Sequence, residues 1–283
     1  MTDMSKSLMN TSDKIFNAFV YLFCIIVMVI TGFPLVFLLA NSFKDMPEYM
    51  KNIWMFPKHI YFGNYKQVFK LTFLRYFMNS LIVSVSGVLF IFICGSLMSF
   101  VFARFKFKFT KPLYFLVIAG MMIPIHTTLI PIYTMSNQIG TYDTRIGLIF
   151  PYVSFNLPVT VFIMTQFFKE LPKELEEASM IDGASKMCFF RKILVPLSSS
   201  AFSTVGIYTF LNMWNEFMYA LVLIDSPEKK TLSLGVRDFY GFMTVNIPAV
   251  LTAILVGSLP VLIFYFVAQD KVINGLTQGA VKG

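Results

Sequence analysis

Six long stretches without a charged residue constrain this chain more than any other feature. None of them contains Asp, Glu, Lys or Arg, and the shortest has 23 residues; they cover 15–43, 76–103, 112–142, 146–168, 193–215 and 239–269. A helix needs about 20 apolar residues to cross the hydrocarbon core of a bilayer. Because lipid offers the backbone no hydrogen-bond partner, such segments must be helical. The sequence therefore predicts an all-α, polytopic membrane protein with six transmembrane helices.

The charged residues indicate how these helices are oriented. Only 13% of the residues are charged, which is too few to cover a soluble protein of this size. The net charge of +8 could suggest a nucleic-acid partner, but the basic residues cluster between the apolar stretches. The densest cluster contains Arg104, Lys106, Lys108 and Lys111, so we expect this loop in the cytoplasm. With six spans, both termini are then cytoplasmic.

One membrane domain accounts for the whole chain. We expect a cytoplasmic N-terminus over 1–14 and a single permease domain over 15–283, with its core at about 76–269, a cytoplasmic loop at 171–196 and a cytoplasmic tail at 270–283. The first stretch could also be a signal peptide, because Lys6 and Lys14 precede it. Its length and the lack of an A-x-A-like cleavage site favour a retained helix. The three cysteines, Cys24, Cys94 and Cys188, lie in separate segments and predict neither a disulfide framework nor a metal site.

The third stretch contains two prolines around a polar group. Pro124 and Pro131 each remove a helix hydrogen bond, so the span should break or kink near both. Interrupted helices at membrane depth often line a cavity. His126 and Thr127 are therefore candidates for the substrate path, with a kink filled by ordinary packing as the alternative.

The end of the fifth stretch carries Asn212, Asn215 and Glu216. A carboxylate inside a membrane is costly and is a functional hypothesis by default. We therefore add these three residues to the possible substrate path. The alternative is that Glu216 reaches interfacial water near the outer end of the span.

The segment 171–196 predicts two short helices joined by a bend. Pro172 suits a first helical turn, and the acidic residues after it favour the positive end of the helix dipole. Gly183 suits a left-handed reversal, and a second helix can start after Ser185 and run to Pro196. A separate feature is the face formed by Leu175, Ala178 and Ile181. In the cytoplasm this face must pack beneath the chain's own spans or against a partner.

The same segment resembles the EAA loop of ABC importer permeases. That pattern reads Glu-Ala-Ala, three residues, Gly, nine residues, Ile, one residue, Leu-Pro. The chain has Glu177-Ala178-Ser179, then Gly183, Ile193 and finally Val195-Pro196 at the same spacing. It departs from the pattern only at Ser179 and Val195, both conservative. The resemblance implies that the loop is coupled to an ATPase through Glu177, Ala178, Ser179, Gly183, Ile193 and Pro196.

More of the chain resembles the second, smaller permease subunit of maltose-type sugar importers. The similarity includes Asn79-Ser-Leu-Ile-Val-Ser, Ala103-Arg-Phe, Trp214-Asn-Glu-Phe217 and the tail from Gln269. It implies a type I ABC importer permease fold and three partners: a second permease, a dimeric ATPase, and an extracellular or periplasmic solute-binding protein. By the same resemblance, the tail contacts the ATPase through Gly279, Val281, Lys282 and Gly283.

ATP hydrolysis must then occur on another subunit. The chain has no G-x-x-x-x-G-K-[ST] phosphate loop, so ATP and magnesium are expected on the partner ATPase, and this chain is expected to be a non-catalytic permease in the bacterial cell membrane. An ion-driven secondary transporter using Glu216 or Asp225 is a weaker alternative, because it needs no coupling loop. A membrane enzyme is weaker still, since His59 and His126 lie in unrelated segments.

The solute is less constrained than the mechanism. A phosphate-bearing solute such as glycerol phosphate should require Arg or Lys within a span, and the six stretches contain none. A polyamine path should contain more acid than Glu216 provides. A neutral sugar or oligosaccharide is compatible with the amides, hydroxyls and aromatic residues of the third and fifth stretches.

Overall fold

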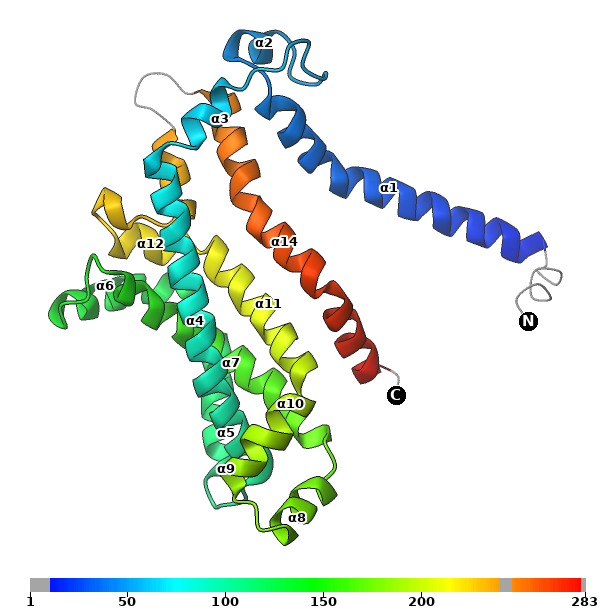
Figure 1. Cartoon of the computed structure of the whole chain (residues 1–283), viewed down its shortest axis with the longest axis vertical. Coiled ribbons are helices and arrows are strands. Elements are labelled where there is room, and N and C mark those ends of the chain that lie inside the picture. Colours follow the sequence, from blue (N-terminus) through cyan, green and yellow to red (C-terminus); the bar gives the residue numbers. More distant parts are fainter. Residues whose placement is uncertain (1–10, 240–245, 281–283) are drawn as a thin grey trace. The chain divides into compact units, whose positions relative to one another are not determined.

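The computed structural model describes residues 11–239 and 246–280. Within these residues the chain forms helices and connecting turns without any strand, as Figure 1 shows. The all-α prediction is therefore confirmed. The chain divides into two compact units, one made of the segment up to Val68 together with residues 246–256, the other of residues 69–239 and the part of the last helix that follows Val256.

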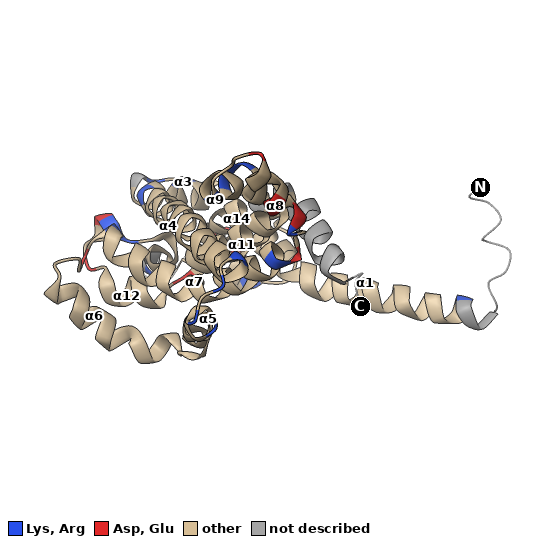
Figure 2. Ribbon diagram, turned by 90° about the horizontal axis from the view of Figure 1, so that it is seen from below, with Lys and Arg blue, Asp and Glu red and all other residues tan. Residues whose placement is uncertain are grey.

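The first unit contains α1 (Thr11–Ser42), α2 (Met46–Lys51), α3 (Gly63–Val68) and the start of α14 (Ile247–Ala280). Apolar side chains are exposed all round α1, which carries no charge after Lys14 (Figure 2). A helix of this kind is suited to lipid or to another membrane helix. At its end, buried Lys44 donates from Nζ to the Asn41 Oδ1 (2.9 Å) and to the carbonyl of Asn52 (2.8 Å).

The second unit is built on α4 (Leu71–Arg104), α7 (Arg145–Glu170) and α11 (Ser199–Asn215), which pack against one another. Figure 1 shows α4 and α7 side by side. Two glycines of α4 permit its close approach to the other two helices. A Cβ on Gly95 would lie 2.5 Å from the Cγ2 of Thr160 on α7, and a Cβ on Gly87 would lie 2.5 Å from the Sδ of Met213 on α11. Small residues at such crossings let membrane helices pack closely.

The third apolar stretch is broken, as its prolines predict. It consists of α5 (Thr110–Ala119), η2 (Gly120–Met122), η3 (Ile125–Thr128) and α6 (Leu129–Gln138). The two halves meet at an angle of 95°, with extended Pro124 between them. The expected break at Pro124 is confirmed, whereas the one at Pro131 is wrong. Pro131 lies in the first turn of α6, where its missing N–H leaves no helix hydrogen bond unmade.

The fifth apolar stretch is not one straight span. The segment Lys186–Leu197 meets Ser199–Asn215 at 75°, and Ser198 lies at the bend. The first part comprises α9 (Lys186–Phe189), the π-helix η4 (Phe190–Leu194) and α10 (Val195–Leu197). The expectation of a straight span beginning at residue 193 is therefore wrong. The absence of charged residues indicates that a segment can lie in lipid, but it does not indicate that the segment is straight. The straight part, α11, has 17 residues and a length of about 25 Å.

The helix lengths are compatible with six spans. Among the described residues, three helices are long and apolar enough to cross a membrane, namely Lys14–Ser42, Thr72–Arg104 and Arg145–Glu170, and counting each bent pair as one span gives up to five. The apolar part of α14, Ile247–Ile263, adds a shorter helix. Helix α14 begins later than the predicted residue 239, because Phe239 belongs to η6 (Val236–Phe239).

A polar clasp around Asp143 joins the loop before α7 to the segment after α12 (Met218–Leu223). Asp143 has φ 54°, and its N–H donates to the Leu223 carbonyl (2.9 Å). Its carboxylate accepts from the Ser226 N–H (3.0 Å) and hydroxyl, the Asp225 N–H (3.1 Å) and the Lys229 Nζ (2.8 Å). Burial raises the pKa of Asp143, but these hydrogen bonds outweigh it and hold the pKa well below its usual range. The clasp fixes the position of α12.

Candidate functional sites

Helix α8 (Glu174–Ile181) is the centre of the predicted coupling loop. Its first turn contains Glu174, Glu176 and Glu177, which stabilise the positive end of the helix. The chain turns away from the helix at Gly183, two residues after Ile181. Gly183 has φ +81° and donates its N–H to the Met180 carbonyl (3.0 Å). The Ala184 N–H donates to the Ser179 carbonyl (2.9 Å), which completes a Schellman motif. The predicted left-handed reversal at Gly183 is confirmed.

The apolar side chains of α8 face outward. Leu175 is 39% exposed and Ile181 is 87% exposed, and Ala178 is exposed between them. The alternative that this face packs beneath the chain's own spans is therefore wrong. On the other side, Ser179 is buried and donates its hydroxyl to the Glu176 carbonyl (2.7 Å), so the extra oxygen at this departure from the EAA pattern is satisfied.

Arg104 joins α8 to two long helices. It is the last residue of α4, and its side chain is 2% exposed. Its Nη2 donates to the carbonyls of Phe168 (2.7 Å), near the end of α7, and Leu171 (2.9 Å). Its Nη1 lies 3.8 Å from the Glu176 Oε2 in the first turn of α8. One guanidinium therefore connects the ends of α4 and α7 to α8.

The second half of the loop is a helix, as predicted. Ser185 caps it by accepting from the Cys188 N–H (3.2 Å). Phe190 is buried and its ring centroid lies 4.9 Å from that of Phe100 on α4. Of the predicted coupling residues here, Ile193 is half-buried and Pro196 is exposed in α10. This half of the loop is therefore packed onto α4, whereas α8 projects.

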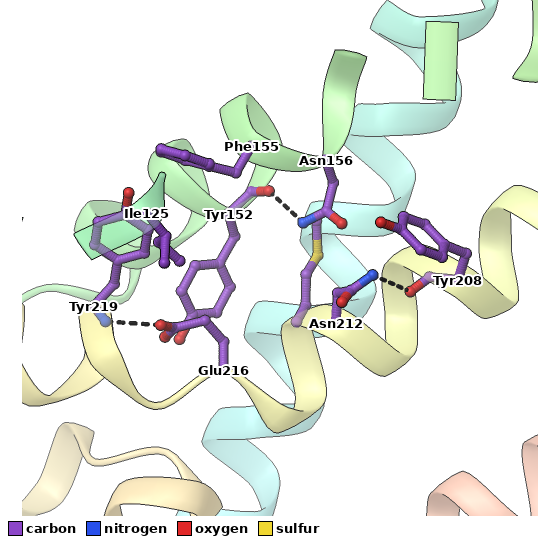
Figure 3. A pocket seen from close by; sticks show the side chains of 9 residues that line it. Ile125, Tyr152, Phe155, Asn156, Tyr208, Asn212, Glu216 and Tyr219 are labelled. Carbon is purple, nitrogen blue, oxygen red and sulfur yellow. Dashed lines mark hydrogen bonds between the residues drawn. The ribbon is translucent and has the colours of Figure 1, made fainter. Parts of the chain in front are cut away.

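A second candidate site is a pocket of about 180 Å³ where α11 ends (Figure 3). Its wall comes from α7, α11, α12 and η3. The polar part of the lining consists of Tyr152, Asn156, Tyr208, Asn212, Glu216 and Tyr219, and the apolar part of Ile125, Phe155 and Met213. Aromatic side chains together with a few fixed polar groups are typical of small-molecule sites.

Glu216 lies between α11 and α12 and is part of the pocket wall. Its Oε1 accepts from the Tyr219 N–H (2.8 Å) and its Oε2 from the Ala220 N–H (3.3 Å), so the carboxylate caps α12. The Ser233 hydroxyl donates to the Glu216 carbonyl (2.6 Å). The carboxylate is thus held by backbone donors at the pocket wall, as Figure 3 shows for Tyr219.

The break in the third stretch contributes to this pocket, but not through the predicted residues. His126 and Thr127 are exposed and do not line it. Instead Ile125 lines it, and the Thr128 hydroxyl lies 2.7 Å from the Tyr219 hydroxyl. Thr128 also donates to the Ile125 carbonyl (2.7 Å). The two prolines pointed to the right segment, while the residues that face the pocket are the neighbours of those we expected.

The fifth stretch contributes two of its three expected residues. Asn212 and Glu216 line the pocket, whereas Asn215 is exposed and donates to the Leu211 carbonyl (2.9 Å). Tyr208 was missed, although Tyr208 and Asn212 are spaced by four on α11 and Glu216 follows at the same spacing just after the helix. Tyr152 and Asn156 on α7 have the same spacing. That pattern was visible in the sequence, but nothing local indicates that the two faces meet.

Two further expectations fall outside this geometry. Gly279 lies in the last turn of α14, whose side chains are not described there, and Val281, Lys282 and Gly283 lie outside the described residues. Among the residues that the structure does describe, no group of three His, Cys, Asp or Glu could hold a metal ion. Because the side chains of the tail are not described, its contact with an ATPase stays a prediction.

Comparison with known proteins identifies the family. Residues 87–273 match the model of the family described as binding-protein-dependent transport system inner membrane component. ORF2 of Caldicellulosiruptor sp. (strain Rt8B.4), which carries the name of an ABC transporter permease, is 45% identical over 264 residues, 93% of this chain and 96% of its own length. The diacetylchitobiose uptake system permease protein NgcG of Streptomyces coelicolor is 31% identical over 96% of this chain and 91% of its own.

A solved structure gives the same result for the fold. A chain of the bacterial ABC transporter involved in the import of the acidic polysaccharide alginate superposes with a TM-score of 0.83 at 21% identity, covering 94% of this chain and 99% of that one. The expected importer permease fold is confirmed, and the chain belongs to the family of inner membrane components of binding-protein-dependent transport systems, the permeases of ABC transporters.

Proposed function

We propose that this chain is a transmembrane subunit of an ATP-driven importer for a sugar or oligosaccharide, and that it forms the translocation path with a second permease. Its relative NgcG is named for diacetylchitobiose uptake, and the similar solved structure belongs to an alginate importer. The pocket supports a neutral solute, because no Lys or Arg lines it. A solute-binding protein delivers the sugar on the outer side.

One observation supports coupling to a partner ATPase, namely the exposed apolar patch of Leu175, Ala178 and Ile181 on α8. An apolar patch at a projecting helix is suited to a protein partner. Acidic residues in the first turn of α8 lie at one end of the patch and give the contact a polar rim there. The ATPase, which binds ATP and magnesium, docks here, so α8 is cytoplasmic and both chain termini are cytoplasmic.

Arg104 connects α8 to α4 and α7, so that α8 can act as a lever on these two helices. Because its guanidinium holds α8 to the ends of α4 and α7, a displacement of α8 by the ATPase is transmitted to the two most closely packed long helices. Coupling of this kind is reciprocal, so ATP binding and the outward-open state favour each other. The tail residues Gly279–Gly283 form a second ATPase contact in this scheme.

Replacing Ile181 by glutamate tests the docking surface. Burying an isoleucine contributes about 2 kcal/mol, so Ile181→Glu should weaken binding of the ATPase subunit at least about 30-fold and abolish uptake. Co-purification of the subunits and uptake into proteoliposomes measure the two effects. The matched control is Ile139→Glu, because Ile139 is 61% exposed beside another helix end, α6. If Ile181→Glu bound the ATPase and transported like the control, the coupling assignment would be wrong.

A further inference from the structure

We propose that the pocket at the end of α11 is a binding subsite for one neutral, hydroxyl-rich ring, so that this subunit itself contacts the transported sugar. The inference rests on the proposed function and names where, within the importer, the solute is held. The volume of about 180 Å³ lies below the roughly 300–1,000 Å³ of sites for drug-sized ligands. That space suits a single sugar ring rather than a whole oligosaccharide.

Tyr152 supplies the observation that points to a ligand. Its residue is only 2% exposed, and its hydroxyl faces the Glu216 carboxylate without forming a hydrogen bond of good geometry among the described residues. Figure 3 shows the ring pointing into the pocket, toward the Glu216 carboxylate. A buried hydroxyl that is poorly hydrogen-bonded destabilises a protein, and native structures rarely retain one without a function. A ligand hydroxyl in the pocket would satisfy it.

Two side-chain amides, of Asn156 and Asn212, are positioned to form hydrogen bonds with ligand hydroxyl groups. Asn156 donates one N–H to the Tyr152 carbonyl (2.8 Å), and Asn212 donates one to the Tyr208 carbonyl (3.0 Å). Both bonds are drawn in Figure 3. Each bond orients its amide and leaves the Oδ1 and the second N–H for a ligand. Two fixed groups that each offer a donor and an acceptor match hydroxyls, which also donate and accept.

The aromatic part of the wall suits the apolar face of a sugar ring. The ring centroids of Phe155 and Tyr219 lie 5.6 Å apart, and those of Tyr152 and Tyr219 lie 6.4 Å apart. Tyr219 is held by its hydrogen bond to Thr128. Since these rings are already packed, binding orders few side chains, which favours affinity.

The charge in the pocket disfavours an anionic ligand. Glu216 is the only charged residue of the lining, so an anionic solute would meet repulsion. Its two oxygens accept from the Tyr219 and Ala220 N–H groups, which stabilise the negative charge without a cation. The remaining lone pairs can accept from ligand hydroxyls.

The test measures sugar binding directly. The chain is purified with its second permease and ATPase but without the solute-binding protein, and equilibrium binding of radiolabelled diacetylchitobiose, melibiose, trehalose and maltose is measured. Tyr152→Phe keeps the ring and removes only the buried hydroxyl, so binding of the recognised sugar should weaken about three- to tenfold. Asn212→Ala should weaken binding at least as much. The control Asn215→Ala, outside the pocket, should bind like wild type.

The outcomes separate this inference from the proposed function. If the sugar bound equally well to wild type, Tyr152→Phe and Asn212→Ala, the subsite would be overturned while sugar import stood. Failure to bind any of the four sugars, by a complex that still takes one up with its binding protein, would also overturn the subsite. Displacement of the sugar by spermidine would overturn its neutral character. A complex that takes up another solute and none of the sugars would contradict the proposed function itself.

Discussion

Helix α8 and the pocket at the end of α11 are built in opposite ways. Helix α8 is one continuous segment whose apolar side chains are exposed, up to 87% at Ile181. The pocket draws on four helices and encloses its most informative side chain, Tyr152, which is 2% exposed. The difference follows from what each must meet. A partner protein needs a surface that is complete before binding, whereas a small solute needs a wall assembled from distant residues.

Replacing Gly183 by aspartate should have the largest effect and should act only on the α8 region. The residue has φ +81°, a conformation that costs a non-glycine residue about 1–2 kcal/mol, and the added charge lies beside the docking patch. Gly183→Asp should remain in the membrane but abolish uptake, as measured in proteoliposomes. Gly140→Asp is the matched control, since Gly140 has φ +72° and, like Gly183, no atom within 4 Å of a built Cβ. Equal uptake by the two variants would contradict the role of α8 in coupling to the ATPase.

Replacing Arg104 should break the connection between α8 and the long helices. Arg104→Ala leaves the carbonyls of Phe168 and Leu171 without their donor, and we expect a loss of stability of about 2–4 kcal/mol. Sugar uptake per ATP hydrolysed should fall, because the ATPase still docks on α8. Arg104→Lys keeps the charge but not the paired donors, so it should be intermediate. A transport-to-hydrolysis ratio equal to wild type in Arg104→Ala would contradict the lever.

Replacing Asp143 should have a smaller effect, confined to the pocket side. Asp143→Asn removes charge-assisted bonds from Lys229 and Ser226, so the melting temperature at pH 7 should fall by a few degrees, equivalent to about 1–3 kcal/mol. Because the folded pKa of Asp143 lies below its unfolded value of about 3.9, its contribution is complete above that pH and is lost as the pH falls through the folded pKa. Wild type and variant should therefore differ constantly from pH 5 to 8 and converge in acid. The exposed Asp225→Asn is the control, and a pH-dependent difference near neutrality would refute the assignment.

The two regions also differ in how far the sequence predicts them. Gly183 and Ser185 are local signals, and both the bend and the second helix lie where they indicate. Pro124 likewise marks a real break. Local signals failed at Ser198, where a bend occurs within an uncharged stretch, and at Pro131, which a helix accepts in its first turn.

The pocket could be predicted only in fragments. Asn212 and Glu216 were found because polar residues in an apolar stretch are conspicuous. Tyr152 and Asn156 were not found, because only the packing of α7 against α11 brings them to Glu216. Neither His126 nor Thr127 lines the pocket, since the direction of a side chain at a broken helix depends on the turn geometry. The exposure of α8 also needed the fold, because the sequence left packing beneath the spans open.

Cross-linking of α8 to the ATPase tests the central claim most directly. In a variant whose three cysteines, Cys24, Cys94 and Cys188, are replaced by alanine, Ile181→Cys is introduced and the assembled importer is treated with a short bifunctional thiol reagent. Our account predicts a covalent product between this chain and an ATPase subunit carrying one cysteine in its docking cleft. Asn212→Cys in the pocket should give none. A transport-competent complex in which Ile181→Cys forms no product, or Asn212→Cys forms as much, would contradict the account.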